Sequence, residues 1–258
     1  MGALDGVGVL VTRPRNQAAG LCAALAAQGA NIRQLAAIEI TPLADADRLA
    51  AQTDRVGEAD LVIFTSANAV RFGAALLRGR EVALAAIGPS TARALRDAGH
   101  RIAIEPAVGF DSEHLLADPR LRDPRGARIA IIKGVDGREL LAHELAARGA
   151  QVHAVEVYRR ERAKPAPAEI AAVTAAISAG ELNVVTATSL EIASALLDLS
   201  PPPLRSALAS IHWLVAGARV AAGLERLGLG ARRIVADSAL DQSLVEALLR
   251  WRASASGA

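Results

Sequence analysis

Residues 61–70 read LVIFTSANAV, four apolar residues that run directly into a small hydroxylated turn. A near-continuous apolar run is typical of a strand that is buried on both faces, as in a parallel sheet. Thr65-Ser66 then opens a helical pattern that continues through Leu77. The plan recurs in VVTATSLEI (184–192), where Thr188-Ser189 stands at the corresponding place. Two copies of one strand–turn–helix unit therefore predict an α/β fold with parallel sheets.

Outside these two stretches, short apolar runs alternate with amphipathic segments along the whole chain. The predicted strands are 7–12, 32–35, 61–64, 82–87, 101–104, 127–132, 152–154, 182–186, 211–215 and 232–235. The predicted helices between them include 17–28, 67–77, 90–98, 138–148, 190–199 and 218–227. We expect Pro201-Pro-Pro203 to form a stiff surface loop.

An internal repeat indicates two related halves. Residues 8–30 align without gaps on residues 128–150, and the Thr-Ser turn recurs about 123 residues on. Segments 37–42 and 154–162 each alternate in period two, which predicts a pair of connecting strands. This pairing would give one domain of 1–36 with 163–258 and a second of 43–153, with the connectors forming a ribbon. Two consecutive domains would also account for the repeat.

Composition restricts the class of protein. The 258 residues suit two domains of about 100–130 residues each, and 29 basic residues nearly balance 27 acidic ones. With two Trp, one Tyr and three Phe, neither a stacking platform nor a basic stripe for nucleic acid is visible. The single cysteine excludes an internal disulfide and a multi-Cys zinc site. No 18-residue span is free of charge and the start lacks a basic n-region, so we expect a cytoplasmic protein without a membrane segment.

Polar turns at the ends of the predicted strands form the candidate binding site. Ligands of open parallel sheets bind beyond the carboxyl ends of the strands, where helix N-termini present free N–H groups. Several such turns would suit a ligand with many carboxylates, although helix capping alone accounts for each turn singly. The candidate binding residues are Thr12, Arg13, Thr65, Ser66, Asn68, Ser90, Thr91, Lys133, Gly134, Thr188, Ser189 and Gly217.

Familiar catalytic and cofactor signatures are missing. No GxxxxGK[ST] motif exists, Gly6-Val-Gly8 precedes its strand instead of following it, and no histidine cluster has metal-ligand spacing. Tyr158, the only tyrosine, lies on the second connector. Its phenol could donate to a leaving hydroxyl or a carboxylate without adding charge. The alternative is a half-buried aromatic of a strand.

Five segments together resemble one enzyme family. They are VLVTRP (9–14), VIFTSANAV (62–70), AIGPSTARALRDAG (86–99), KGVDGRELLAHELAARGA (133–150) and VEVYRRE (155–161). In order and spacing they are similar to the uroporphyrinogen-III synthases, which cyclise hydroxymethylbilane. The resemblance implies two discontinuous α/β domains of the flavodoxin or Rossmann type, joined by a two-stranded β ribbon. It also implies an enzyme that acts on a linear, polycarboxylate tetrapyrrole with no cofactor or metal. Nothing in the sequence suggests a nucleic-acid or membrane partner, or an assembly larger than a monomer.

The resemblance further implies roles for individual residues. Tyr158 matches the family's ribbon tyrosine, a proton donor or positioning group, and the candidate binding turns would surround an interdomain cleft. One departure is Val220, which stands where the family usually offers a hydroxyl. Val220 favours an alternative, a non-catalytic two-lobed binding or regulatory module, whereas Tyr158 argues against it. A relative of the two-lobed solute-binding proteins would share the predicted crossing.

Overall fold

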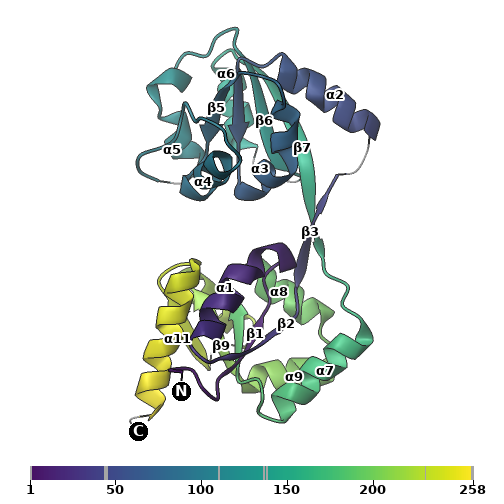
Figure 1. The fold of residues 1–258 in the computed structure, drawn as a ribbon, viewed down its shortest axis with the longest axis vertical. Helices are drawn as coiled ribbons and strands as arrows, with labels where there is room; N and C mark the ends of the chain where they lie inside the picture. Colours follow the sequence, from purple (N-terminus) through teal and green to yellow (C-terminus); the bar gives the residue numbers. More distant parts are fainter. Residues whose placement is uncertain are drawn as a thin grey trace. The chain divides into compact units, whose positions relative to one another are not determined.

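The chain forms two compact units that are connected twice. The computed structural model describes residues 2–43, 46–109, 111–135, 137, 139–229 and 231–256. Unit 1 comprises Met1–Ile40 and Glu161–Ala258, and unit 2 comprises Thr41–Arg160. Figure 1 shows both units and labels most of their helices and strands.

Unit 1 contains a five-stranded parallel sheet. Its strands are β1 (Gly8–Val11), β2 (Asn31–Gln34), β8 (Val184–Ala187), β9 (His212–Ala216) and β10 (Arg233–Ala236). Their spatial order is β10-β9-β8-β1-β2, and every neighbouring pair is parallel. Since β1 is followed first by β2 on one side and then by β8, β9 and β10 on the other, this is the flavodoxin order.

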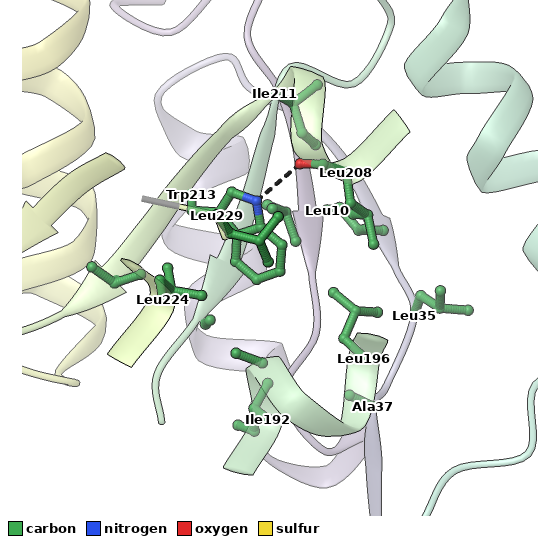
Figure 2. Close-up of a cluster of buried hydrophobic side chains, with 14 of the residues drawn as sticks. Leu10, Leu35, Ala37, Ile192, Leu196, Leu208, Ile211, Trp213, Leu224 and Leu229 are labelled. Carbon is green, nitrogen blue, oxygen red and sulfur yellow. Dashed lines mark hydrogen bonds between the residues drawn. The ribbon is translucent and has the colours of Figure 1, made fainter. Parts of the chain in front are cut away.

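Helices cover both faces of this sheet, because consecutive residues of its central strands are buried and point to opposite faces. Val9 and Val11 of β1 pack with α1 (Arg15–Ala27) and α11 (Asp241–Ser256), whereas Leu10 joins the cluster on the opposite face. The helices of that face are α7 (Pro167–Ser178), α8 (Leu190–Leu199), α9 (Pro202–Ser210) and α10 (Ala218–Arg226). Figure 2 shows this cluster around Trp213, whose indole N–H donates to the carbonyl oxygen of Leu208 at 2.9 Å.

Unit 2 has the same winding with four parallel strands, and β3 (Ile38–Pro42) forms the fifth strand at one edge of its sheet. Its strands are β4 (Leu61–Phe64), β5 (Ala83–Ala86), β6 (Arg128–Gly134) and β7 (Gln151–Arg162), and the sheet order is β3-β7-β6-β4-β5. The pairs β4–β5, β4–β6 and β6–β7 are parallel. The helices are α2 (Ala46–Gly57), α3 (Ala67–Gly73), α4 (Pro89–Asp97), α5 (Ser112–Leu116) and α6 (Leu140–Ala147), with short 3₁₀ helices η1 (Ala74–Leu77) and η2 (Pro119–Leu121).

A ribbon of β3 (Ile38–Pro42) and β7 carries the chain from unit 1 to unit 2 and back. The N–H of Ala163 donates to Ala37 at 3.1 Å, and that of Leu43 donates to Val157 at 3.1 Å. Because the numbering rises along one strand as it falls along the other, the pair is antiparallel. The predicted fold class, two discontinuous parallel-sheet α/β domains joined by a two-stranded β ribbon, is confirmed.

Local structure differs from the sequence predictions in three places. The predicted strand 152–154 and the second connector are one continuous strand, β7. The predicted strand 101–104 is wrong: the N–H groups of Ala103 and Ile104 both donate to the Leu84 carbonyl, so no regular ladder forms beyond one bridge. The predicted loop at the prolines is also wrong, since Pro202 begins α9, and proline is tolerated in a first helical turn.

Candidate functional site

Sheet topology marks one point in each unit where a ligand is expected. In a doubly wound sheet the crevice lies beyond the carboxyl ends of the two neighbouring strands from which the chain winds in opposite directions. These strands are β1 and β8 in unit 1 and β4 and β6 in unit 2. Six of the predicted residues lie in the turns that follow β1, β8 and β4, and two more are the last residues of β6: Thr12, Arg13, Thr188, Ser189, Thr65 and Ser66 in the turns, and Lys133 and Gly134 in the strand.

In unit 2 the structure brings Tyr158 into contact with the turn after β4. The hydroxyl oxygens of Tyr158 and Ser66 lie 3.1 Å apart, a hydrogen bond in which either can be the donor. Ser66 is also the N-cap of α3, and its oxygen accepts from the N–H of Ala69 at 3.0 Å. The contact therefore joins the ribbon strand to the start of a helix.

The Tyr158 side chain reaches this position because β7 is irregular. Lys133 pairs with Glu156, but the next residue, Gly134, pairs with Tyr158, so Val157 is an extra residue on β7. Such a bulge re-aims the side chains beside it, and here Val157 and Tyr158 are both buried. Tyr158 is 5% exposed, so its ring is buried more deeply than in the half-buried strand position that was the alternative to a chemical role.

The ring of Tyr158 contacts a glycine and an aromatic side chain. A Cβ atom on Gly134 would come within 2.7 Å of two ring carbons, so the ring occupies the space that any other side chain at 134 would need. On α3, Phe72 contacts the ring with a centroid separation of 5.8 Å and a tilt of 33°. Phe72 was not predicted as a site residue, and nothing in its local sequence indicates a partner on β7.

Thr65 and Asn68 complete this turn. The Thr65 hydroxyl and its backbone N–H both donate to the carbonyl of Ile132, at 3.2 and 3.1 Å. Asn68, in the first turn of α3, is buried. Thr65 thus holds the turn against β6, while Ser66 faces Tyr158.

Lys133, at the end of β6, is a buried cation with partners in its own turn. It is 3% exposed, and its ammonium group donates to the carbonyl of Gly137 at 3.0 Å and pairs with Glu139. The Glu139 side chain is 71% exposed, so the ion pair has one buried and one solvated partner. The pair closes the turn between β6 and α6.

In unit 1 the corresponding turn is also held by internal contacts. Thr12 is fully buried; its hydroxyl donates to the Thr186 carbonyl, and its N–H donates to the Thr186 hydroxyl at 3.2 Å. Arg13 is 9% exposed and binds the Asp241 carboxylate and the Ala239 carbonyl. These side chains tie β1 to β8 and to the start of α11.

The remaining predicted residues begin helices. Ser189 is the N-cap of α8 and accepts from Ile192 N–H at 3.2 Å, and Thr188 beside it is partly exposed. Ser90 and Thr91 lie in the first turn of α4, where Ser90 is exposed and Thr91 is buried. Gly217 precedes α10 with φ of 86°, a left-handed conformation that favours glycine.

One hollow in unit 2 lies away from all these turns. Its volume is about 630 Å³, and it is lined at the amino-terminal end of β5 by residues that include Arg80, Val82, His100 and Arg101. None of the predicted site residues lines it. Among the residues that the structure describes, no three His, Cys, Asp or Glu side chains gather as metal ligands would. No helix within the described ranges is long and apolar enough to cross a bilayer.

Comparisons with known proteins agree on one family. A family model described as "Uroporphyrinogen-III synthase HemD" matches residues 20–246. The uroporphyrinogen-III synthases of Escherichia coli K12 and Salmonella typhimurium LT2 are each 33% identical over 252 residues, which cover 93% of this chain and 99% of the relative.

Solved structures agree in fold. A crystal structure of a mutant uroporphyrinogen III synthase from Thermus thermophilus matches with a TM-score of 0.60 and 22% identity, over 95% of this chain and 98% of that chain. The enzyme from Helicobacter pylori also gives a TM-score of 0.60, at 14% identity over 95% and 99% of the two chains. With a family model that covers most of the chain and relatives that match along nearly their whole length, this chain belongs to the uroporphyrinogen-III synthase family.

Proposed function

We propose that this chain cyclises hydroxymethylbilane to uroporphyrinogen III, with loss of water and inversion of ring D. Family membership supports the reaction. The observation that carries the assignment to this chain's own residues is the hydrogen bond between Tyr158 and Ser66 at the carboxyl edge of the unit 2 sheet. A phenol held there can serve as a neutral acid beside a polyanionic substrate.

Tyr158 acts in the step that creates the electrophile. Its O–H bond breaks as the proton moves to the terminal hydroxyl of the substrate, the carbon–oxygen bond breaks, and water leaves. Ring D is then inverted through a spiro intermediate before the macrocycle closes, and the proton lost as the last pyrrole regains its aromaticity restores the phenol. General acid catalysis of this kind contributes about 10²–10⁴-fold to a rate.

Selection of the correct closure is a problem of orientation. The activated chain closes head to tail without inversion when it is left free, so the enzyme must hold one conformer. The starts of α3, α4, α8 and α10 offer backbone N–H groups to the substrate carboxylates, and the exposed Ser90 and the partly exposed Thr188 add hydroxyls. Thr12, Arg13 and Lys133 are already bonded within their own units, and we assign them to shaping these turns.

The non-catalytic alternative rested on Val220. In the structure Val220 is 5% exposed and packs in the apolar cluster of unit 1. A hydroxyl at that position would lie in the core and not on the surface of the turn. The valine at position 220 is therefore no evidence that this protein lacks catalytic activity.

A coupled assay tests the proposed function. Hydroxymethylbilane is generated in situ, the protein is added, and the oxidised products are separated into porphyrin isomers I and III. We expect isomer III well above the level of the reaction without protein. Isomer I alone, from a folded protein, would contradict the proposal and favour a binding module.

We also propose that the enzyme works as a cytoplasmic monomer. The large apolar side chains that are exposed among the described residues, Val108, Leu227, Val235 and Leu240, are single residues on separate segments. A monomer is expected to sediment near its 26.6 kDa mass, and a dimer at micromolar concentration would contradict it.

A further inference from the structure

We propose that Ser66 is a positioning residue that acts through Tyr158: it donates its proton to the phenol oxygen and so aims the phenol proton at the substrate. The inference rests on the proposed function, because it assigns a role within the same reaction. The sequence pattern placed Ser66 among the carboxylate-binding residues. The structure shows its hydroxyl 3.1 Å from Tyr158 instead.

The hydrogen bonds around Ser66 allow its hydroxyl to donate to the phenol, and the chemistry of the proposed step requires this direction. The Ser66 oxygen accepts from the N–H of Ala69, so its own proton remains for a second bond. If Tyr158 donated to Ser66, the phenol proton would be occupied and could not reach a leaving group. The catalytic arrangement is therefore Ser66 as donor and Tyr158 as acceptor.

This direction also favours the transition state. As the phenol gives up its proton, its oxygen gains negative charge. A hydrogen bond to a charged oxygen is roughly twice as strong as one between neutral groups. The bond from Ser66 thus becomes stronger as the reaction proceeds, which lowers the barrier and not merely the energy of the bound substrate.

The neighbouring residues keep the phenol within reach of Ser66. Gly134 leaves no space between its backbone and the ring, and Phe72 contacts the ring from α3. Thr65 holds the turn to β6 through the Ile132 carbonyl. The Tyr158 ring is therefore held by Gly134 of β6 and Phe72 of α3, and Ser66 is held by the turn that begins α3.

Unit 1 supplies a matched control. Ser189 occupies the same place as Ser66 in the repeat, and each serine is an N-cap that accepts from the third N–H beyond it. Ser189 has no phenol partner, because the single tyrosine of the chain is Tyr158. Ser66→Ala and Ser189→Ala each remove a cap, but only Ser66→Ala removes the contact with Tyr158.

Nuclear magnetic resonance of the full chain, labelled with ¹³C at the phenolic carbon of tyrosine, tests the inference without reference to activity. One tyrosine gives one resonance. We expect Ser66→Ala to move this resonance, and Ser66→Thr, which keeps a hydroxyl, to hold it near its wild-type position. Ser189→Ala should leave it unmoved. A resonance that stays in place in Ser66→Ala, or that moves equally in Ser189→Ala, would overturn the inference.

Kinetics of the same variants test the functional part. We expect Ser66→Ala to lower kcat about tenfold with KM changed less than twofold, and Ser66→Thr to recover most of the rate. A rise in KM at constant kcat would mean that Ser66 binds substrate directly, which overturns the positioning role. If the wild type makes no isomer III, the proposed function fails, while the resonance still decides whether Ser66 holds the phenol.

Discussion

The carboxyl end of β1 in unit 1 and that of β6 in unit 2 have the same arrangement of a buried cation and a carboxylate. Arg13 and Lys133 stand at matching places in the internal repeat, at the carboxyl end of a core strand. Both are buried, and each is paired with a carboxylate, Asp241 or Glu139. From this comparison we infer that these cations stabilise their turns through their ion pairs.

The two turns differ at the next residue. Unit 1 has Pro14, which precedes α1, whereas unit 2 has Gly134, against which Tyr158 packs. The Thr-Ser turns differ in the same way, since Ser66 contacts a phenol and Ser189 does not. We infer that duplication supplied the scaffold and helix starts twice, while the acid group is carried by unit 2 alone.

Loss of the phenol is expected to have the largest effect. Tyr158→Phe keeps the ring contacts with Gly134 and Phe72 and removes only the hydroxyl. Turnover to isomer III should fall about 10²-fold or more with KM nearly unchanged, while loss of the partly buried hydrogen bond to Ser66 should lower the free energy of unfolding by about 1 kcal/mol. Turnover equal to that of the wild type would reduce Tyr158 to a packing residue and make the two units equivalent.

A methyl group at Gly134 should have the second-largest effect. Gly134→Ala places a Cβ 2.7 Å from the Tyr158 ring, so the ring must shift away from Ser66. We expect a roughly tenfold loss of kcat and about 1–3 kcal/mol of lost stability. Pro14→Ala at the matching place in unit 1 is the control and should cost only about 0.4–1 kcal/mol. Equal effects on kcat from the two variants would contradict the assignment to unit 2.

The two serine caps allow a smaller test on stability. Ser66→Ala and Ser189→Ala should each lower the free energy of unfolding by about 1 kcal/mol, through loss of the N-cap. The loss at Ser66 should be the larger, because its hydroxyl also bonds Tyr158. Urea denaturation followed by circular dichroism measures both. A larger loss at Ser189 would mean that the bond to the phenol adds nothing to folding.

The smallest expected effect is on the stability of the protein at acidic pH. At matching places in the repeat, the Asp60 carboxylate accepts from the N–H of Arg128 at 2.8 Å, and the Asn183 side-chain oxygen accepts from that of Gly8 at 3.2 Å. The hydrogen bond from the Arg128 backbone, with a further one from its guanidinium, lowers the pKa of Asp60.

A lowered pKa in the folded state means that Asp60 contributes stability above its unfolded-state pKa of about 3.9. This contribution is lost as the pH falls through the lower, folded-state pKa. Asp60→Asn copies the residue of unit 1, so wild type and variant should differ more in unfolding temperature at about pH 6 than at about pH 2.5. A difference that is the same at both pH values would contradict the linkage.

Much of the fold could be predicted because it depends on local patterns that occur twice. The apolar runs at 61–64 and 184–187, each followed by Thr-Ser and a helical pattern, predict parallel strands and the caps of α3 and α8. The five-residue α5 is too short to show a helical period. The start of α9 could not be predicted, because prolines occur both in the first turn of a helix and in loops, and the sequence alone does not distinguish the two.

The candidate site could be predicted only in part. Place at a strand end singled out Ser66 and Gly134, and Tyr158 was singled out as the only tyrosine, on a connector; the structure brings Tyr158 into contact with both. The bulge at Val157 that aims the phenol depends on register, and no residue type signals it. The ion pair of Arg13 with Asp241 joins segments from opposite ends of the chain, so sequence spacing cannot reveal that this cation is already neutralised.

The most direct measurement of the central claim is a double-mutant cycle between Ser66 and Tyr158, read as kcat for isomer III. Ser66→Ala should lower kcat about tenfold in the wild-type background. In the Tyr158→Phe background the same change should lower it less than twofold, because the group through which Ser66 acts is gone. The coupling should be absent for Ser189→Ala with Tyr158→Phe. Equal factors for Ser66→Ala in both backgrounds would show that Ser66 acts independently of the phenol and would contradict the account.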